Sequence, residues 1–278
     1  MKAINTISIA ALLTVLTCSC AMTDNYTPAQ VEKQAQIETL TIMAGFNGTK
    51  ADNSVFKNNW NTSESIAVVS ERGESRFLSI NSGDVVEFAS CTKSFDASSV
   101  TAVYPYIQNV SNGAAFSFAG QNGTLENINK FNLMTASGSV RNGLANLTFN
   151  NRIAVLCLSN VTLDGCRAEN IKSIELNGVA ESVEVKSENG NINITPADNG
   201  KITVNNPSLF TSDIYVAFFA DNATSSIEIA VYDAMGGEWF LTLDNGNAFQ
   251  AGQVYNVENV TLKGGYPITF NPGVENWN

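Results

Sequence analysis

The 278-residue sequence contains no histidine. Without an imidazole the chain can form neither a Ser-His-Asp triad nor a Cys-His dyad, and it lacks a common ligand of zinc. Pairs of carboxylates are a further catalytic arrangement, but acidic residues are so numerous that a pair arises readily by chance. We therefore expect no enzyme activity, no cofactor and no metal site.

Basic residues are scarce: 15 Lys and Arg face 26 Asp and Glu, which gives a net charge of −11. No cluster of basic residues stands out from this background. An acidic surface repels phosphate groups, so nucleic acids and anionic headgroups are excluded as expected partners. Hydrophobic residues make up 44% of the chain, a share typical of a globular protein with a real core.

Long hydrophobic runs are rare, and the clearest one lies at the N-terminus. Lys2 precedes an uncharged apolar run over residues 4–16, which is too short to cross a bilayer as a mature helix. Residues 1–19 are therefore predicted to be a secretory signal peptide. The polar residues 20–36, which include Pro28, are predicted to form a flexible spacer.

The end of this leader, LTCSC, resembles the lipobox of bacterial lipoproteins, in which the first mature residue is an acylated cysteine. Cys20 is the preferred lipidation site because the small Ser19 precedes it. Cys18 is the alternative, although it follows the β-branched Thr17. We expect a lipid anchor in the outer membrane, since two or three acyl chains bind a bilayer far more firmly than one. A plain secreted protein is the other reading.

Cysteine is also rare, and beyond the leader the chain has Cys91, Cys157 and Cys166. An odd number of cysteines in an exported protein leaves at least one thiol unpaired. Cys157 and Cys166 are close enough to face each other across a hairpin around Asp164 and Gly165, which makes them a candidate disulfide. The alternative is that each is a small, buried apolar residue.

From residue 37 onward, short runs with apolar residues at every second position predict half-buried strands. The runs are residues 37–42, 65–69, 100–104, 153–158, 171–176, 214–219, 227–232 and 254–262. Nine Asn-Gly or Asp-Gly pairs, such as Asn142-Gly143 and Asn189-Gly190, separate the runs and favour two-residue hairpin turns. The predicted class is all-β, with antiparallel sandwiches or barrels.

A small, polar stretch between Ser137 and Gly143 suggests a domain boundary. Enough strands lie on each side for one sandwich. We therefore predict two antiparallel β-sandwich domains in tandem, over residues 37–140 and 141–278. Trp60, Trp239 and Trp277 are candidate stacking platforms for a sugar ring, although Trp239 lies in a strand-like run where a core role is more common.

Several motifs, in order, resemble the fimbrillin family. They are FNGTK at residues 46–50, Trp60 followed by SIAV at 65–68, Tyr104-Pro105, LMTA at 133–136, LTFNNRIAVL at 147–156, IYVAFF at 214–219, FQAGQVYNVENVTL at 249–262, and Trp277. The resemblance covers nearly all of the mature chain. It implies two β-sandwich domains of transthyretin-like character, export as a lipoprotein, and a structural or adhesive role in surface fimbriae.

The resemblance also implies assembly with other fimbrial subunits by strand exchange, in which a neighbour's strand fills a groove vacated by an N-terminal strand. The candidate leaving strand covers residues 37–43 and includes Ile37, Leu40 and Ile42. The candidate donor contains Tyr266, Ile268 and Phe270.

The family's shaft subunits are cut by an arginine-specific protease, but no arginine lies between Cys20 and Arg72. Lys50 is therefore the candidate processing site, and the other expectation is an anchor, tip or accessory subunit that keeps its lipid. Such a protein could also contact host or bacterial surface ligands. The alternative function is a non-polymerising outer-membrane lipoprotein that binds surface glycan.

Overall fold

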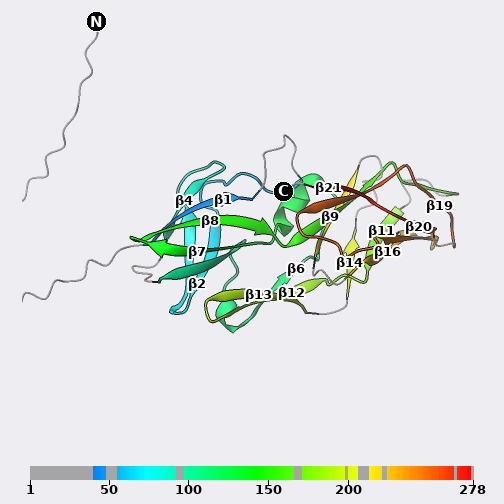
Figure 1. Cartoon of the computed structure of the whole chain (residues 1–278). Helices are drawn as coiled ribbons and strands as arrows, with labels where there is room; N and C mark the ends of the chain where they lie inside the picture. Colours follow the sequence, from blue (N-terminus) through cyan, green and yellow to red (C-terminus); the bar gives the residue numbers. More distant parts are fainter. Residues whose placement is uncertain are drawn as a thin grey trace, which may run out of the picture. The chain divides into compact units, whose positions relative to one another are not determined.

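The computed structural model describes residues 40–47, 55–91, 97–165, 171–197, 200–205, 213–220, 224–265 and 268–276. Strands predominate in these ranges (Figure 1), and the longest helix among them, α1 (Leu125–Ile128), has four residues. Two 3-10 turns, η1 (Val110–Asn112) and η2 (Asn129–Phe131), accompany it. The predicted all-β class is confirmed, while the tandem arrangement of two sandwiches stays a prediction.

Seven strands close into a barrel in the order β1-β4-β3-β2-β5-β7-β8. Most neighbours are antiparallel, but β1 and β8 are parallel. The strands are β1 (Thr41–Phe46), β2 (Ser65–Ser70), β3 (Gly73–Ser79), β4 (Val86–Ser90), β5 (Ser99–Tyr104), β7 (Met134–Arg141) and β8 (Leu144–Asn151).

The inward-facing side chains of these strands form a core of their own, which includes Ile66, Val68, Phe77 and Phe88. Each of these four is fully buried. The alternation of buried and exposed residues along β8 shows how the period of two predicted from the sequence places one face inward.

Two further sheets share a larger core, and their strands come mostly from the second half of the chain. One sheet has the order β14-β11-β16-β17-β20 and the other β15-β9-β18-β21, and β10 pairs with β19 in a short ladder. Their bounds are β9 (Ile153–Ser159), β10 (Thr162–Leu163), β11 (Ile171–Asn177), β14 (Lys201–Val204), β15 (Ile214–Phe219), β16 (Ser226–Asp233), β17 (Glu238–Asp244), β18 (Gln253–Glu258), β19 (Thr261–Leu262), β20 (Ile268–Phe270) and β21 (Gly273–Asn276).

A three-stranded sheet, β13-β12-β6, combines segments that are far apart in the sequence. It consists of β6 (Ala114–Ser117), β12 (Ser182–Glu188) and β13 (Asn191–Pro196). The predicted boundary between residues 140 and 141 falls at the end of β7, and the next strand, β8, still belongs to the barrel. The division into two domains at this position stays a prediction.

Local turn chemistry explains several strand limits. Asn142-Gly143 and Asn189-Gly190 have positive φ at both residues, as two-residue hairpin turns require, and they join β7 to β8 and β12 to β13. The predicted strand over residues 254–262 is interrupted at Asn259, whose φ of 55° lies in the left-handed region. This residue separates β18 from β19.

The outer edge of β15 is covered by a side chain instead of a strand. Gln121 donates through Nε2 to the Ala217 carbonyl at 2.7 Å, and its Oε1 accepts from the Ala217 N–H at 2.7 Å. Because Gln121 is 2% exposed, the amide satisfies both backbone groups away from water. It thus caps an edge to which a further strand could otherwise pair.

Replacing Gln121 with leucine should lower the free energy of unfolding by about 2–4 kcal/mol, because the buried backbone groups of Ala217 lose their partners. Chemical denaturation measures the change. Gln250→Leu, at an exposed position, serves as the control and should change stability by less than about 0.5 kcal/mol. Equal effects of the two substitutions would contradict the capping role.

Candidate functional site

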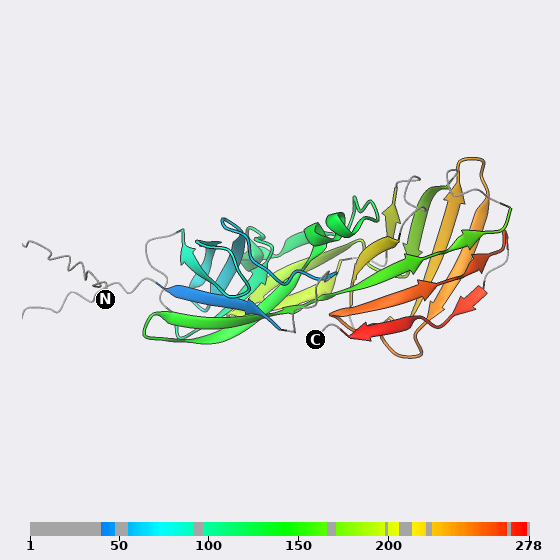
Figure 2. The ribbon, with the colours of Figure 1, turned by 90° about the horizontal axis from the view of Figure 1, so that it is seen from above.

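The candidate leaving strand of the sequence corresponds to β1, which lies between β4 and β8 in the barrel (Figure 2). Residues 41–44 pair with residues 86–89 of β4 in antiparallel register, and residues 41–46 pair with residues 144–149 of β8 in parallel register. Both edges of β1 are therefore hydrogen-bonded. Its removal would open the barrel between β4 and β8.

Alternate side chains of β1 point into the barrel core. Leu40 is 3% exposed, and Ile42 and Ala44 are fully buried. Phe46, at the end of the strand, packs on the same core while remaining partly exposed. Two residues of the candidate leaving strand, Leu40 and Ile42, thus face inward, while Ile37 lies outside the described residues.

Trp60 holds the end of β1 through an aromatic cluster. Its ring stacks on Phe46 with a centroid distance of 4.5 Å and an interplanar angle of 25°. Phe88, Tyr104 and Phe149 meet the same indole edge-on at centroid distances of 5.0–5.3 Å. Such pairs contribute about 0.5–1.5 kcal/mol each beyond their buried area.

A charged group covers this cluster. Lys57 Nζ lies 5.4 Å from the centroid of the Trp60 ring and 5.3 Å from that of Tyr104. The ammonium also pairs with Glu64 Oε1 at 2.8 Å, and the Tyr104 hydroxyl donates to the same oxygen at 3.2 Å. Burial, together with the charge of Glu64, raises the pKa of the Tyr104 hydroxyl well above its ordinary value.

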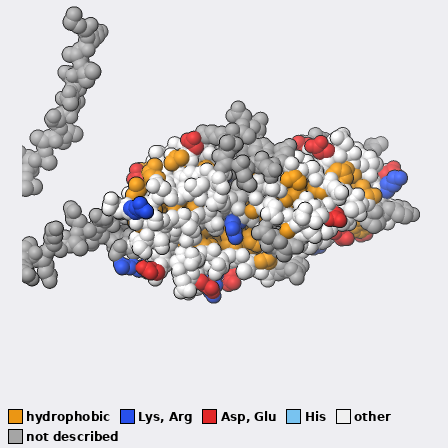
Figure 3. Space-filling view, viewed as in Figure 1, with side chains coloured by type: hydrophobic (Ala, Val, Ile, Leu, Met, Phe, Trp, Pro, Cys, Tyr) orange, Lys and Arg blue, Asp and Glu red, His pale blue; other side chains and the backbone are white. Residues whose placement is uncertain are grey.

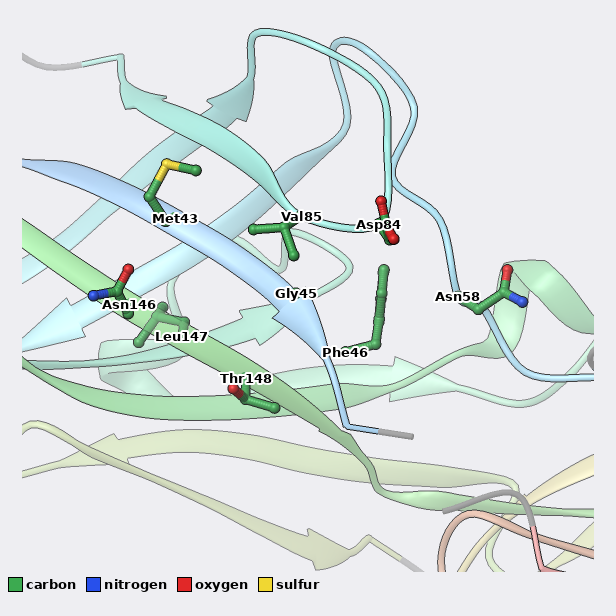
Figure 4. A pocket seen from close by; sticks show the side chains of 9 residues that line it. All are labelled: Met43, Gly45, Phe46, Asn58, Asp84, Val85, Asn146, Leu147 and Thr148. Carbon is green, nitrogen blue, oxygen red and sulfur yellow. The ribbon is translucent and has the colours of Figure 1, made fainter. Parts of the chain in front are cut away.

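A groove of about 420 Å³ runs along the outer face of β1 (Figure 4). Met43 and Gly45 form its floor, and Val85 and Asn146 stand beside it. A Cβ atom on Gly45 would lie 3.1 Å from Val85 Cγ2, so the lack of a side chain there lets Val85 approach the strand closely. Val85 is nevertheless 59% exposed.

The candidate donor residues Ile268 and Phe270 lie in β20, at an edge of the five-stranded sheet. They pair in parallel with Leu241 and Leu243 of β17, and both side chains are partly buried against the larger core. β21 follows and pairs with β18 at the edge of the neighbouring sheet. β20 and β21 are thus seated in sheets of their own chain, each with one neighbouring strand among those that the structure describes.

Several predicted site residues lie outside the described residues, and their predicted roles stay predictions. They are Cys18, Cys20, Ile37, Lys50, Cys166, Tyr266 and Trp277. The other two tryptophans are buried, Trp60 at 1% and Trp239 at 5% exposure. Neither offers an open face for stacking on a sugar ring.

The hairpin predicted around Asp164 and Gly165 stays a prediction, because the residues after Gly165 lie outside the described ranges. The strand that carries Cys157, β9, lies inside its sheet between β15 and β18, and β10 pairs with β19. Cys157 is buried, and its Sγ lies 3.5 Å from Ser159 Oγ. Because the structure does not describe Cys166, the disulfide itself stays a prediction.

The described residues contain no cluster of three or more His, Cys, Asp or Glu side chains that could hold a metal ion. Within the same ranges, no helix is both long and apolar enough to cross a membrane. On the face in Figure 3, Lys and Arg are scattered, and several of them lie beside Asp or Glu. The described side chains on this face therefore form no basic patch.

Comparisons with known proteins agree with this architecture. A family model described as fimbrillin-like matches residues 30–277. The crystal structure of a candidate cell adhesion protein from Bacteroides ovatus is 13% identical, with a TM-score of 0.55, and the match covers 87% of this chain and 98% of that one. A corresponding protein from Bacteroides uniformis gives 13% identity and a TM-score of 0.54 over 88% and 100%. No curated protein sequence matches the chain.

The barrel, the accompanying sheets and the strand-lined groove define an all-β protein. The similarity to the two solved structures supports this fold alone, because their sequence identity is low. The family match extends over most of the sequence, and the chain belongs to the fimbrillin-like family. It is thus a non-enzymatic, cell-surface protein of the fimbrial and cell-adhesion type.

Phe46→Ala should loosen β1 and lower the free energy of unfolding by about 2–3 kcal/mol, since the stack on Trp60 is lost. Amides of residues 41–46 should also exchange faster with deuterium. Met43→Ala, on the outer face of the same strand, is the matched control and should cost about 1 kcal/mol or less. If both variants behave alike, Trp60 does not anchor β1.

The two described cysteines should react differently with iodoacetamide near pH 8. Cys91 is exposed and should be alkylated in the folded protein. Cys157 should be protected, because burial raises the pKa of its thiol and blocks access. After unfolding without reductant, alkylation of Cys157 would exclude the predicted disulfide with Cys166, and protection of both would support it. Rapid labelling of native Cys157 would contradict its burial.

Proposed function

We propose that the chain is a structural or adhesive fimbrial subunit that is exported as a lipoprotein and assembles with other subunits by strand exchange. The observation that carries this proposal is the position of β1, which closes the barrel by pairing with β4 and β8. Removal of this strand would expose two rows of unpaired backbone groups. An alternating strand from a neighbour would satisfy them.

The buried apolar side chains of β1 favour a barrel in which another strand takes the place of β1 over a barrel in which that place stays empty. Leu40 and Ile42 are almost fully buried, and burial of each such side chain is worth about 1.5–3 kcal/mol. A barrel without β1 would expose the matching inner surface to water. The incoming strand would recover most of this free energy, and head-to-tail repetition of the contact would produce a filament.

The position of Lys50 in the sequence suits the proposed cut. Lys50 follows the end of β1 at Phe46 and precedes the next described residue, Val55, so cleavage there would detach β1 and no other described strand. Arg72 lies in the turn between β2 and β3. A cut at Arg72 would also detach β2, which supports Lys50 as the processing site.

The proposed anchor is a lipid on Cys20, with Cys18 as the alternative, and residues 20–36 would act as a spacer from the outer membrane. Residues 37–140 and 141–278 would form two sandwich-like domains of transthyretin-like character. Tyr266, Ile268 and Phe270 are the initial candidates for the donor strand. The solved relatives named above are candidate cell adhesion proteins, which supports contact with host or bacterial surface ligands.

Intact mass of the protein from its native cell surface tests this proposal. A chain that starts at residue 51 without lipid would be a processed, polymerising subunit, whereas one that starts at acylated Cys20 would be an anchor, tip or accessory subunit that donates its C-terminal strand. Lys50→Ala should block the first form, and Lys33→Ala should not. An uncut chain without lipid that remains monomeric would overturn the proposal.

A further inference from the structure

The site left by β1 places specific demands on any strand that replaces it. The inward positions of Leu40 and Ile42 take large apolar side chains, and that of Ala44 is fully buried and takes a small one. The outer position of Gly45 lies against Val85, so a small residue fits best. The next position carries an aromatic ring that stacks on Trp60.

We propose that residues 260–265 of a second copy of this chain occupy the position of β1. This inference rests on the strand exchange proposed above and names the partner strand. The sequence LTIMAGF at residues 40–46 corresponds position by position to VTLKGGY at residues 260–266. Val260 and Leu262 would take the apolar inward positions, and Gly264 and Gly265 the two small ones. The next residue in the sequence is aromatic in both segments.

The two segments differ in character at one position, where the apolar Met43 corresponds to the charged Lys263. The lysine would face an acidic residue there. Met43 lies directly opposite Glu87 of β4 in the antiparallel register. In the proposed register Lys263 replaces Met43 and therefore lies opposite the Glu87 carboxylate. Opposite charges at directly facing positions stabilise a strand pair.

Other segments meet these demands less well. With Phe270 in the aromatic position, Ile268 would replace the fully buried Ala44, and Thr269 would replace Gly45 against Val85. Adding methylenes to a closely packed core is unfavourable. Residues 160–163 repeat the sequence NVTL of residues 259–262, but Cys166 and Arg167 would then stand at the last two positions.

The proposed donor is held in its own chain by short pairings only, with β10 and also with β17, where Gly264 bridges Trp239 and the Gly265 N–H donates to the Glu238 carbonyl at 3.1 Å. β19 pairs with two residues of β10, and β20 and β21 lie at the edges of their sheets. Val260 and Leu262 are 7% and 1% exposed in their own core. They would enter positions of nearly equal burial, so apolar contact is exchanged instead of lost.

Disulfide trapping between two chains tests the register. One chain carries Lys263→Cys and the other, with a different tag, carries Asn146→Cys, because Asn146 of β8 is the parallel partner of Met43. Both also carry Cys91→Ser to remove the exposed thiol. The two proteins are produced together in the native cell and oxidised at its surface. All three substituted residues are exposed in the structure, which favours normal folding.

The matched comparison pairs Thr269→Cys with Thr148→Cys, which would meet if Phe270 occupied the aromatic position. We expect a covalent dimer of the two tags for the first pair and at least a tenfold lower yield for the second. The opposite result would overturn the proposed register while leaving strand exchange intact. Assembly without either dimer would overturn the donor assignment, and absence of assembly would overturn strand exchange itself along with this inference.

Charge exchange provides a second measurement. Lys263→Glu in the donor should slow assembly by roughly two- to fivefold, which corresponds to the loss of one cross-strand charge pair. Glu87→Lys in the acceptor should restore the rate when combined with that donor. If the double exchange rescues nothing, Lys263 does not lie opposite Glu87.

Discussion

The pairing of β1 on both of its edges is the constraint on which the barrel depends. β2 follows β1 in the sequence, yet β4 and β3 lie between them in the sheet, so β1 is placed by contacts distant in the chain. Its parallel alignment with β8 is the exception in a barrel of antiparallel neighbours. β1 is the first strand of the barrel in the sequence, and one connection joins it to the other strands. It can therefore leave the barrel without passing through a loop of another strand.

The aromatic cluster around Trp60 explains why closure has one register. Trp60 lies ahead of β2, where its backbone bonds with Gly83, and its ring meets side chains from β1, β4, β5 and β8. A shift of β1 by one residue would turn Phe46 away from this ring and turn its inward residues to solvent. The ion pair between Lys57 and Glu64 covers one side of the cluster, with the ammonium over the Trp60 ring.

Local patterns in the sequence predict most strands of this fold, because half-buried strands alternate with a period of two and Asn-Gly pairs supply the turns. They do not predict closure, since the pairing of Thr41 with Leu144 depends on residues a hundred positions apart. The polar cap at Gln121 has no periodic signal either. The surroundings of Cys157 are likewise not revealed by spacing, because β9 is paired with β15 on one edge and with β18 on the other.

The free-energy change of the proposed strand exchange depends on how the donor segment is bonded in its own chain and how it would be bonded in the place of β1 of a second copy. In its own chain, the donor segment pairs with β10 through two residues and bonds to β17 through Gly264 and Gly265, whereas a strand in the place of β1 pairs with residues 86–89 on one side and residues 144–149 on the other. Apolar burial is nearly equal in both places, so the gain comes from added backbone hydrogen bonds, each worth about 0.5–1.5 kcal/mol net. Because Val260 and Leu262 must leave one core before they enter another, the proposed exchange would be slow to start and, once completed, slow to reverse.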